Sequence, residues 1–212
     1  MRRSSFTHIM IAVVGFLLPL GSASAQSRDF SGQDLSNTNF SQVNLDGANF
    51  TGAILTDAQF NETSLRNANF TGAEISRTSF AAANLTGANF TRAGGFSPFF
   101  IQANCTRAIF ILLNTHLTSG VFEDAVVTGA DFSGADLVGA DFVGATGVGA
   151  RFVDALVQGA RFDNGNFANA IFDGARVNNA FFLNTNLTNA NFNNATIGGA
   201  SFQGANTTGA VF

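Results

Sequence analysis

The sequence predicts an all-β fold, a four-sided β-solenoid in which the chain turns a corner at every fifth residue. Three observations predict it. A bulky apolar residue returns every five positions, a small residue precedes it by two, and Phe alternates with smaller residues so that it returns every ten. A period of five matches neither the 3.6-residue period of a helix nor the two-residue period of a strand, so neither element alone explains the pattern.

The five-residue period begins at Phe30 and continues, with one gap at Gly95, to Phe110. It then shifts by two residues, resumes at Leu117 and continues to Phe212. The first register holds 17 of these positions and the second holds 20, which makes 37. We call each of them a core position.

Side-chain alternation shows how each repeat faces the core. In an extended segment, residues two apart point to the same side, so Ala48 and Phe50 point inward and Asn49 points outward. Because five is odd, a continuous strand would reverse its faces at the next repeat. A turn in every repeat prevents this reversal, and the Gly, Asn and Asp residues two positions after the core position, such as Gly52 and Asp57, are suited to turns.

The ten-residue recurrence of Phe gives the number of sides. A coil with an even number of sides stacks Phe on Phe, and four sides of five residues make the smallest closed coil that fits. The 37 core positions then form about nine coils, and a spacing of about 4.8 Å per coil gives a rod of roughly 45 Å. Residues twenty apart should stack, which predicts weak, exposed ion pairs at Asp46–Arg66, Asp57–Arg77, Asp131–Arg151 and Asp141–Arg161.

Two five-residue units resemble a known repeat. Ala48-Asn49-Phe50-Thr51-Gly52 and Ala135-Asp136-Leu137-Val138-Gly139 are similar to the A(D/N)LXX unit of the pentapeptide-repeat family, and the match covers essentially the whole mature chain. The resemblance implies a right-handed quadrilateral β-helix whose core is filled by the bulky residue and the Ala. The family includes cytosolic DNA mimics that bind DNA gyrase and confer quinolone resistance, and most of its members have no assigned activity.

The first 25 residues are typical of a signal peptide. A basic start at Arg2 and Arg3 precedes an apolar run, Ile9 to Leu20, and Ala23-Ser24-Ala25 predicts cleavage after Ala25. The run is short for a permanent membrane span, although an uncleaved anchor is the alternative. We therefore expect a signal peptide at 1–25 and a secreted or periplasmic β-solenoid at 26–212, with an irregularity at 94–117.

The composition of the mature chain argues against several classes of function. The net charge is −4, and the loss of Arg2 and Arg3 makes it −6, so we expect no direct binding of nucleic acid, which needs a basic face. A single cysteine, Cys105, excludes an intrachain disulfide and a site of several thiolates, and we expect it in the core. His116 is the only mature histidine, and no nucleophile motif accompanies it. We expect no enzyme activity, no cofactor and no metal.

The repeat is most irregular between Gly94 and Leu117. Gly95 occupies a core position, extra Phe residues follow it, and the two-residue insertion comes after Phe110. We expect a bulge or short loop. The functional interpretation is a partner-binding patch, and the favoured alternative is local repacking around the insertion. The candidate patch consists of Phe96, Phe99, Ile111, Leu112, Leu113 and His116.

Three functions are compatible with these features. The leading one is a structural or protein-interaction scaffold in the periplasm or outside the cell, with a protein or envelope component as partner. The second is a gyrase-binding DNA mimic, which would have to be cytosolic and strongly acidic along one face. The third is a binder of ice or polysaccharide through columns of Asn and Thr that begin at Asn49 and Thr51. Because neither end of the repeat has a cap, we also expect a homodimer formed by end-to-end stacking.

Overall fold

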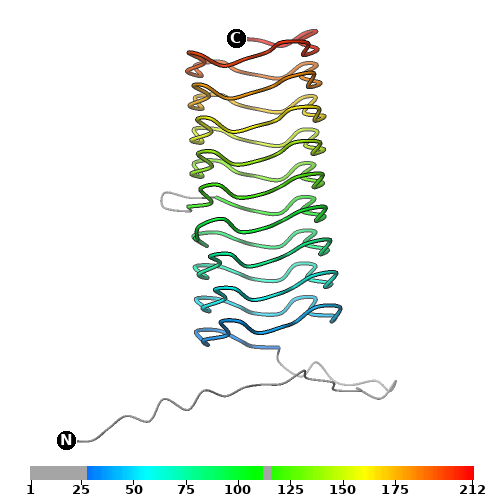
Figure 1. Cartoon of the computed structure of the whole chain (residues 1–212), viewed down its shortest axis with the longest axis vertical. Coiled ribbons are helices and arrows are strands. Elements are labelled where there is room, and N and C mark those ends of the chain that lie inside the picture. The colour runs from blue at the N-terminus through cyan, green and yellow to red at the C-terminus, as the bar shows by residue number, and fades with distance from the viewer. Residues whose placement is uncertain (1–27, 112–115) are drawn as a thin grey trace, which may run out of the picture.

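The computed structural model describes residues 28–111 and 116–212. These residues form one rod of stacked coils, blue at its N-terminal end and red at its C-terminal end (Figure 1). They contain no helix, and their β-structure consists of single-residue parallel bridges, one on each side of each coil. The predicted all-β solenoid is confirmed. The predicted signal peptide, 1–25, lies outside the described residues.

The bridges form four ladders, which we call faces A to D. Bridge residues occur at every fifth residue from Asp29 to Ile109 and from His116 to Val211. Face A begins with Asp29, and faces B, C and D follow at steps of five residues. Asp29 pairs with Asn49, twenty residues on, so one coil has four sides and twenty residues. Face A reaches Val211 after nine steps, eight of twenty residues and one of 22, which gives nine coils.

Backbone hydrogen bonds join each coil to both neighbours. The amide of Phe50 donates to the carbonyl of Asn69 at 2.7 Å, and the amide of Asn69 donates to the carbonyl of Ala48 at 2.9 Å. The corner is closed by the amide of Ala53, which donates to the carbonyl of Phe50 at 3.0 Å. Gly52 in that corner has φ of 63°, the positive value that the third residue of a type II turn requires.

The core consists of two ladders of Phe rings, one behind face A and one behind face C. Within a ladder the rings stack: Phe70 and Phe90 are 4.6 Å apart between centroids and 3° from parallel. Between the ladders they meet edge to face: Phe70 and Phe80 are 5.5 Å apart and 85° from parallel. Both arrangements are favourable for aromatic rings. The prediction that Phe stacks on Phe is confirmed.

Phe167 breaks the alternation, and two glycines accommodate it. Its ring lies behind face D, where most coils carry Leu, Val or Cys. Gly147 occupies the core position one coil earlier, and a Cβ there would lie 2.4 Å from Cε1 of Phe167. Gly165 takes the place of the usual Ala, and its Cβ would lie 2.7 Å from Cε2 of the same ring. The ring of Phe167 therefore fills the space that side chains at positions 147 and 165 would otherwise occupy.

The two-residue insertion is absorbed within one coil. On face C, Phe99 pairs with Val121, and on face A, Ile109 pairs with Asp131, both 22 residues on. From His116 the bridges return to steps of twenty residues, since His116 pairs with Asp136. The ladders therefore continue on both sides of the insertion.

All four predicted ion pairs form, which confirms the twenty-residue coil independently of the backbone. Their closest N–O distances are 2.5, 2.6, 3.5 and 3.9 Å for Asp46–Arg66, Asp57–Arg77, Asp131–Arg151 and Asp141–Arg161, respectively. Arg161 also pairs with Asp163 at 3.0 Å, which counting by twenties does not predict because these two residues are neighbours at one corner.

The packing of Phe167 generates a testable prediction. Gly147→Val should destabilise the protein by about 1–3 kcal/mol because the new side chain overlaps the ring, and Phe167→Leu alone should cost about 1–2 kcal/mol because it leaves a void. The double variant restores the usual residues of this face, so its stability should return to within about 1 kcal/mol of wild type. Urea unfolding of the four proteins measures the coupling, and strictly additive effects would show that the two positions do not share volume.

Candidate functional site

The predicted patch residues lie on several sides of the rod rather than on one. Phe96 stands exposed at the corner between faces B and C, with 60% of its surface accessible. Phe99 is the half-buried bridge residue of face C, Ile111 is half-buried at the corner between faces A and B, and His116 is exposed on face B. The patch residues Leu112 and Leu113 lie outside the described residues.

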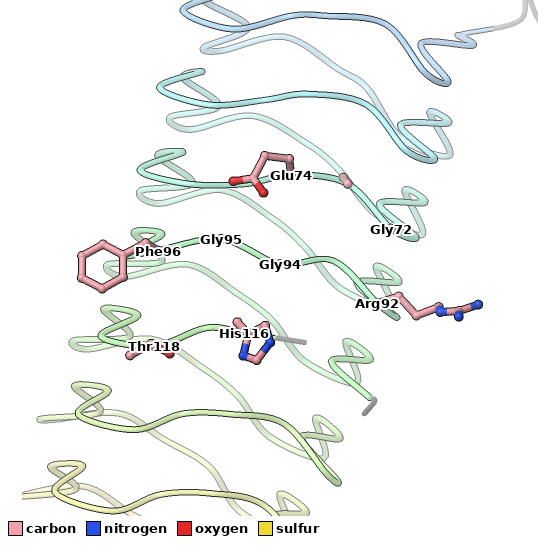
Figure 2. Close-up of a pocket in the computed structure, with 9 residues that line it drawn as sticks. Gly72, Glu74, Arg92, Gly94, Gly95, Phe96, His116 and Thr118 are labelled. Carbon is pink, nitrogen blue, oxygen red and sulfur yellow. The ribbon is translucent and has the colours of Figure 1, made fainter. Parts of the chain in front are cut away.

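A hollow on face B brings two of these residues together. Its volume is about 440 Å³, and Phe96 and His116 both line it (Figure 2). The floor is the backbone of Gly94 and Gly95. The other lining residues are Gly72, Ala73, Glu74, Arg92 and Thr118. The structure thus groups Phe96 with His116 and leaves Phe99 and Ile111 outside this hollow.

The hollow exists because one outward side chain is missing. On face B the bridge residues Glu74, Gly94, His116 and Asp136 follow one another along the rod. Gly94 is the only glycine at a bridge position in the described residues. Its missing side chain leaves a gap between the carboxylate of Glu74 and the imidazole of His116 (Figure 2).

Two polar side chains at the rim of the hollow, Glu74 and His116, contact neighbouring polar residues. Oε1 of Glu74 accepts hydrogen bonds from the backbone amide of Ser76, at 3.0 Å, and from its hydroxyl. Nδ1 of His116 lies 3.2 Å from Oδ2 of Asp136. Both contacts leave the hollow itself open, since Ser76 lies at a corner and Asp136 lies one coil beyond His116.

Sequence reasoning missed Glu74 and Gly94 as parts of this site. The signal was present, because Gly94 stands where other repeats carry a side chain, and Glu74 precedes it by one coil of twenty residues. The predicted patch groups residues that are close in sequence, whereas neighbours on a face are a coil apart.

A second hollow of about 550 Å³ lies where Phe99 meets the pair formed by Asp57 and Arg77. Nε and Nη2 of Arg77 donate to the two carboxylate oxygens of Asp57 at 2.7 and 2.6 Å. These charges already satisfy each other, and the remaining polar lining residues of this hollow, Asn37, Gln59, Asn61 and Ser79, are uncharged.

Reactive groups are scarce in the described part of the chain. Cys105 is fully buried, as predicted, and burial raises the pKa of its thiol, which makes it a poor nucleophile. Residues 28–111 and 116–212 contain no group of three or more His, Cys, Asp or Glu side chains placed to hold a metal. They also contain no helix with the length and apolar character to cross a membrane.

The Asn and Thr columns serve the corners of the coil. Oδ1 of Asn49 accepts from the amide and hydroxyl of Thr51 at 3.1 and 2.6 Å. Asn69 and Thr71 repeat this arrangement at 3.0 and 2.5 Å one coil later. These hydroxyl protons are therefore directed to the protein's own carbonyl oxygens rather than to an external surface.

Comparisons with known proteins identify the repeat. The model described as "Pentapeptide repeat region" matches residues 23–90, and the model described as "Pentapeptide repeats (8 copies)" matches residues 111–146, 150–182 and 166–204. Together the two models cover most of the chain. No curated protein matches it significantly.

Several solved structures are similar at low identity. HetL, a pentapeptide repeat protein involved in heterocyst differentiation regulation from the cyanobacterium Nostoc sp. strain PCC 7120, is 23% identical over 88% of this chain and 92% of its own, with a TM-score of 0.32. QnrB1, a plasmid-mediated fluoroquinolone resistance protein, is 23% identical over 86% and 76%, with a TM-score of 0.33. A pentapeptide repeat protein from the Arabidopsis thaliana thylakoid lumen is 26% identical over 69% and 66%, with a TM-score of 0.17.

The ion pairs predict a pH dependence of stability. Hydrogen bonds from Arg77 lower the pKa of Asp57 below its usual 3.8. A lowered folded-state pKa adds stability above the unfolded-state pKa, and this stability is lost as pH falls through the folded-state value. Asp57→Asn should therefore lower the melting temperature at neutral pH and make little difference at about pH 2.

The matched control for this pH experiment is Glu123→Gln, since Glu123 is exposed and makes no ion pair in the described structure. Thermal unfolding followed by circular dichroism at both pH values gives the comparison. A deficit in Asp57→Asn that persists unchanged at low pH would contradict the ion-pair explanation.

Proposed function

Because the chain belongs to the pentapeptide-repeat family, we propose that it is an exported, non-enzymatic scaffold that binds a protein or envelope component through one side of its rod. The observation that carries this proposal is the exposed ring of Phe96, which is 60% accessible although the core Phe residues of the same coils are fully buried. Exposed apolar side chains that gather in one area, rimmed by polar groups, are typical of an interaction site.

The surroundings of Phe96 support the proposal. Phe99 lies on the adjacent face and is half-buried, and Val121 occupies the next bridge position of that face. Val138 lies at the same corner as Phe96, two coils further on, and is 36% exposed. These side chains place apolar groups on both sides of the corner between faces B and C, with Thr118 between Phe96 and Val138. We call this area the corner surface.

The filled core supports a role without catalysis. Mid-rod residues such as Phe90, Phe100 and Phe122 have no accessible surface, so no internal cavity is left for a substrate beside them. The hollows lie on the outside of the rod, whereas enzymes usually bury most of a small substrate in a concave pocket. The rod therefore acts through its surface.

The two other functions suggested by the sequence have less support. A gyrase-directed DNA mimic would present unpaired acidic groups along a face, whereas Asp46, Asp57 and Asp131 pair with arginines here. Binding of ice or polysaccharide would use the Thr columns, whose hydroxyls at Thr51 and Thr71 are engaged in corner hydrogen bonds. The end-to-end homodimer stays a prediction.

The first experiment tests export. The full chain with a C-terminal tag is expressed in a Gram-negative bacterium, the cells are fractionated, and the N-terminus is read by mass spectrometry. We expect the protein outside the cytoplasm with Gln26 as its first residue, because Ala23-Ser24-Ala25 fits a cleavage site. A cytoplasmic protein that begins at Met1 or Arg2 would show that the proposed export is wrong.

The second experiment tests the corner surface. The tagged mature chain is used to capture partners from an envelope extract of the cells that make it, and we expect Phe96→Ser to lose at least one captured protein that wild type retains. Phe181→Ser is the matched control, because Phe181 is a similarly exposed ring, 42% accessible, on face C but four coils from Phe99. Equal capture by both variants would mean that the corner surface is not the binding site.

A further inference from the structure

The hollow on face B, which forms at Gly94, is bordered by acidic side chains. The hollow lies between Glu74 on one side and His116, paired with Asp136, on the other, and the only arginine at a described bridge position of this face, Arg176, lies two coils beyond Asp136. Arg92 is the one arginine among the lining residues, and its side chain extends away from Gly94 and Gly95 (Figure 2). The charge next to the floor is therefore negative.

The side chain of Glu74 offers a free hydrogen-bond acceptor at this hollow. Oε2 of Glu74 takes part in none of the hydrogen bonds among the described residues, since Ser76 uses only Oε1. Ala93 and Ala103 close their corners by donating to the carbonyls of Phe90 and Phe100, both at 2.9 Å. Pro98 has no N–H, so this corner lacks the equivalent bond to the carbonyl of Gly95, and the free side-chain acceptor at the hollow is the carboxylate of Glu74.

Hydrogen-bond donors on the floor are already used. The amide of Gly94 donates to the carbonyl of Ala73 at 3.0 Å, and the amide of Gly95 donates to the carbonyl of His116 at 2.8 Å. The amide of Phe96 donates to Oγ of Ser76 at 3.0 Å. An anion would need free amide N–H groups, whereas a cation needs a free acceptor such as Oε2 of Glu74. This favours a cationic ligand.

The ring of Phe96 stands at one end of the floor (Figure 2). A guanidinium group has several N–H donors for a free carboxylate oxygen such as Oε2 of Glu74, and the aliphatic stem of an arginine packs on apolar surface such as the ring of Phe96. We propose that the hollow binds one arginine side chain of the partner, with its guanidinium at Glu74 and its aliphatic stem over Gly94 and Gly95 against Phe96. This inference rests on the proposed interaction function and names the group that the scaffold recognises.

The test uses the mature chain and two small probes, N-acetyl-arginine methylamide and its citrulline analogue, which has the same shape without the charge. Binding is followed by two-dimensional amide NMR. We expect the arginine probe to shift the resonances of Gly94, Gly95 and Phe96, and the citrulline probe to bind about tenfold more weakly or not at all. Equal binding of the two probes would overturn the proposal.

Two variants and a control locate the effect. Glu74→Gln should weaken binding of the arginine probe about tenfold, and Gly94→Asn, which places the residue common at bridge positions into the gap, should abolish it. Glu123→Gln removes an exposed carboxylate elsewhere and should leave affinity unchanged. The melting temperature of each variant shows that it is folded. Undiminished binding by Glu74→Gln would overturn the proposal, whatever the effect of Gly94→Asn.

This outcome is separable from that of the proposed function. If the Phe96-dependent partner is captured while the arginine probe does not bind, the arginine site is wrong and the scaffold function stands. If the probe binds through Glu74 but no envelope component depends on Phe96, the site stands and the scaffold function is wrong.

Discussion

Residues of the rod hydrogen-bond to the coil before or after them, so each side chain stands directly beside its counterpart one coil away. The ladder bonds of 2.7–2.9 Å around Phe50 and Asn69 show this spacing. It stacks the same position of successive coils, where Phe rings pack on Phe rings and acidic residues pair with basic ones. The Phe ladders, the Asp46–Arg66 pair and the matching of Gly147 to Phe167 all follow from the same geometry.

The same stacking explains how the hollow at Gly94 can form in a regular rod. A core position without a side chain must be filled by a neighbour or by the backbone, because interiors are close-packed. At Gly147 the ring of Phe167 fills the volume. At Gly95 the backbone of the preceding coil does, since a Cβ there would lie 2.4 Å from the amide nitrogen of Ser76. The hollow above Gly94 is therefore supported by a rigid backbone floor, which suits a binding site better than a loop would.

Function in such a rod can only be a property of its surface. Most outward polar side chains serve the rod itself, as Asn49 does at its corner and Arg77 does with Asp57. The segment around Phe96 differs, because it combines an exposed ring, a carboxylate with a free oxygen at Glu74 and a gap at Gly94. A partner that meets the corner surface would reach the hollow with the same contact, since Phe96 belongs to both.

The architecture follows from the sequence alone, because a five-residue repeat has one way to bury Phe50 and Ala48 together, and the ten-residue recurrence of Phe requires an even-sided coil. The buried Cys105 and the ion pairs followed from position alone. The three-dimensional arrangement was needed to show that Phe96 and His116 share a hollow with Glu74 while Phe99 faces another side. The physical reason is that the site is built from residues a coil apart, and its shape depends on where the backbone at Gly95 lies against Ser76, which no side-chain pattern specifies.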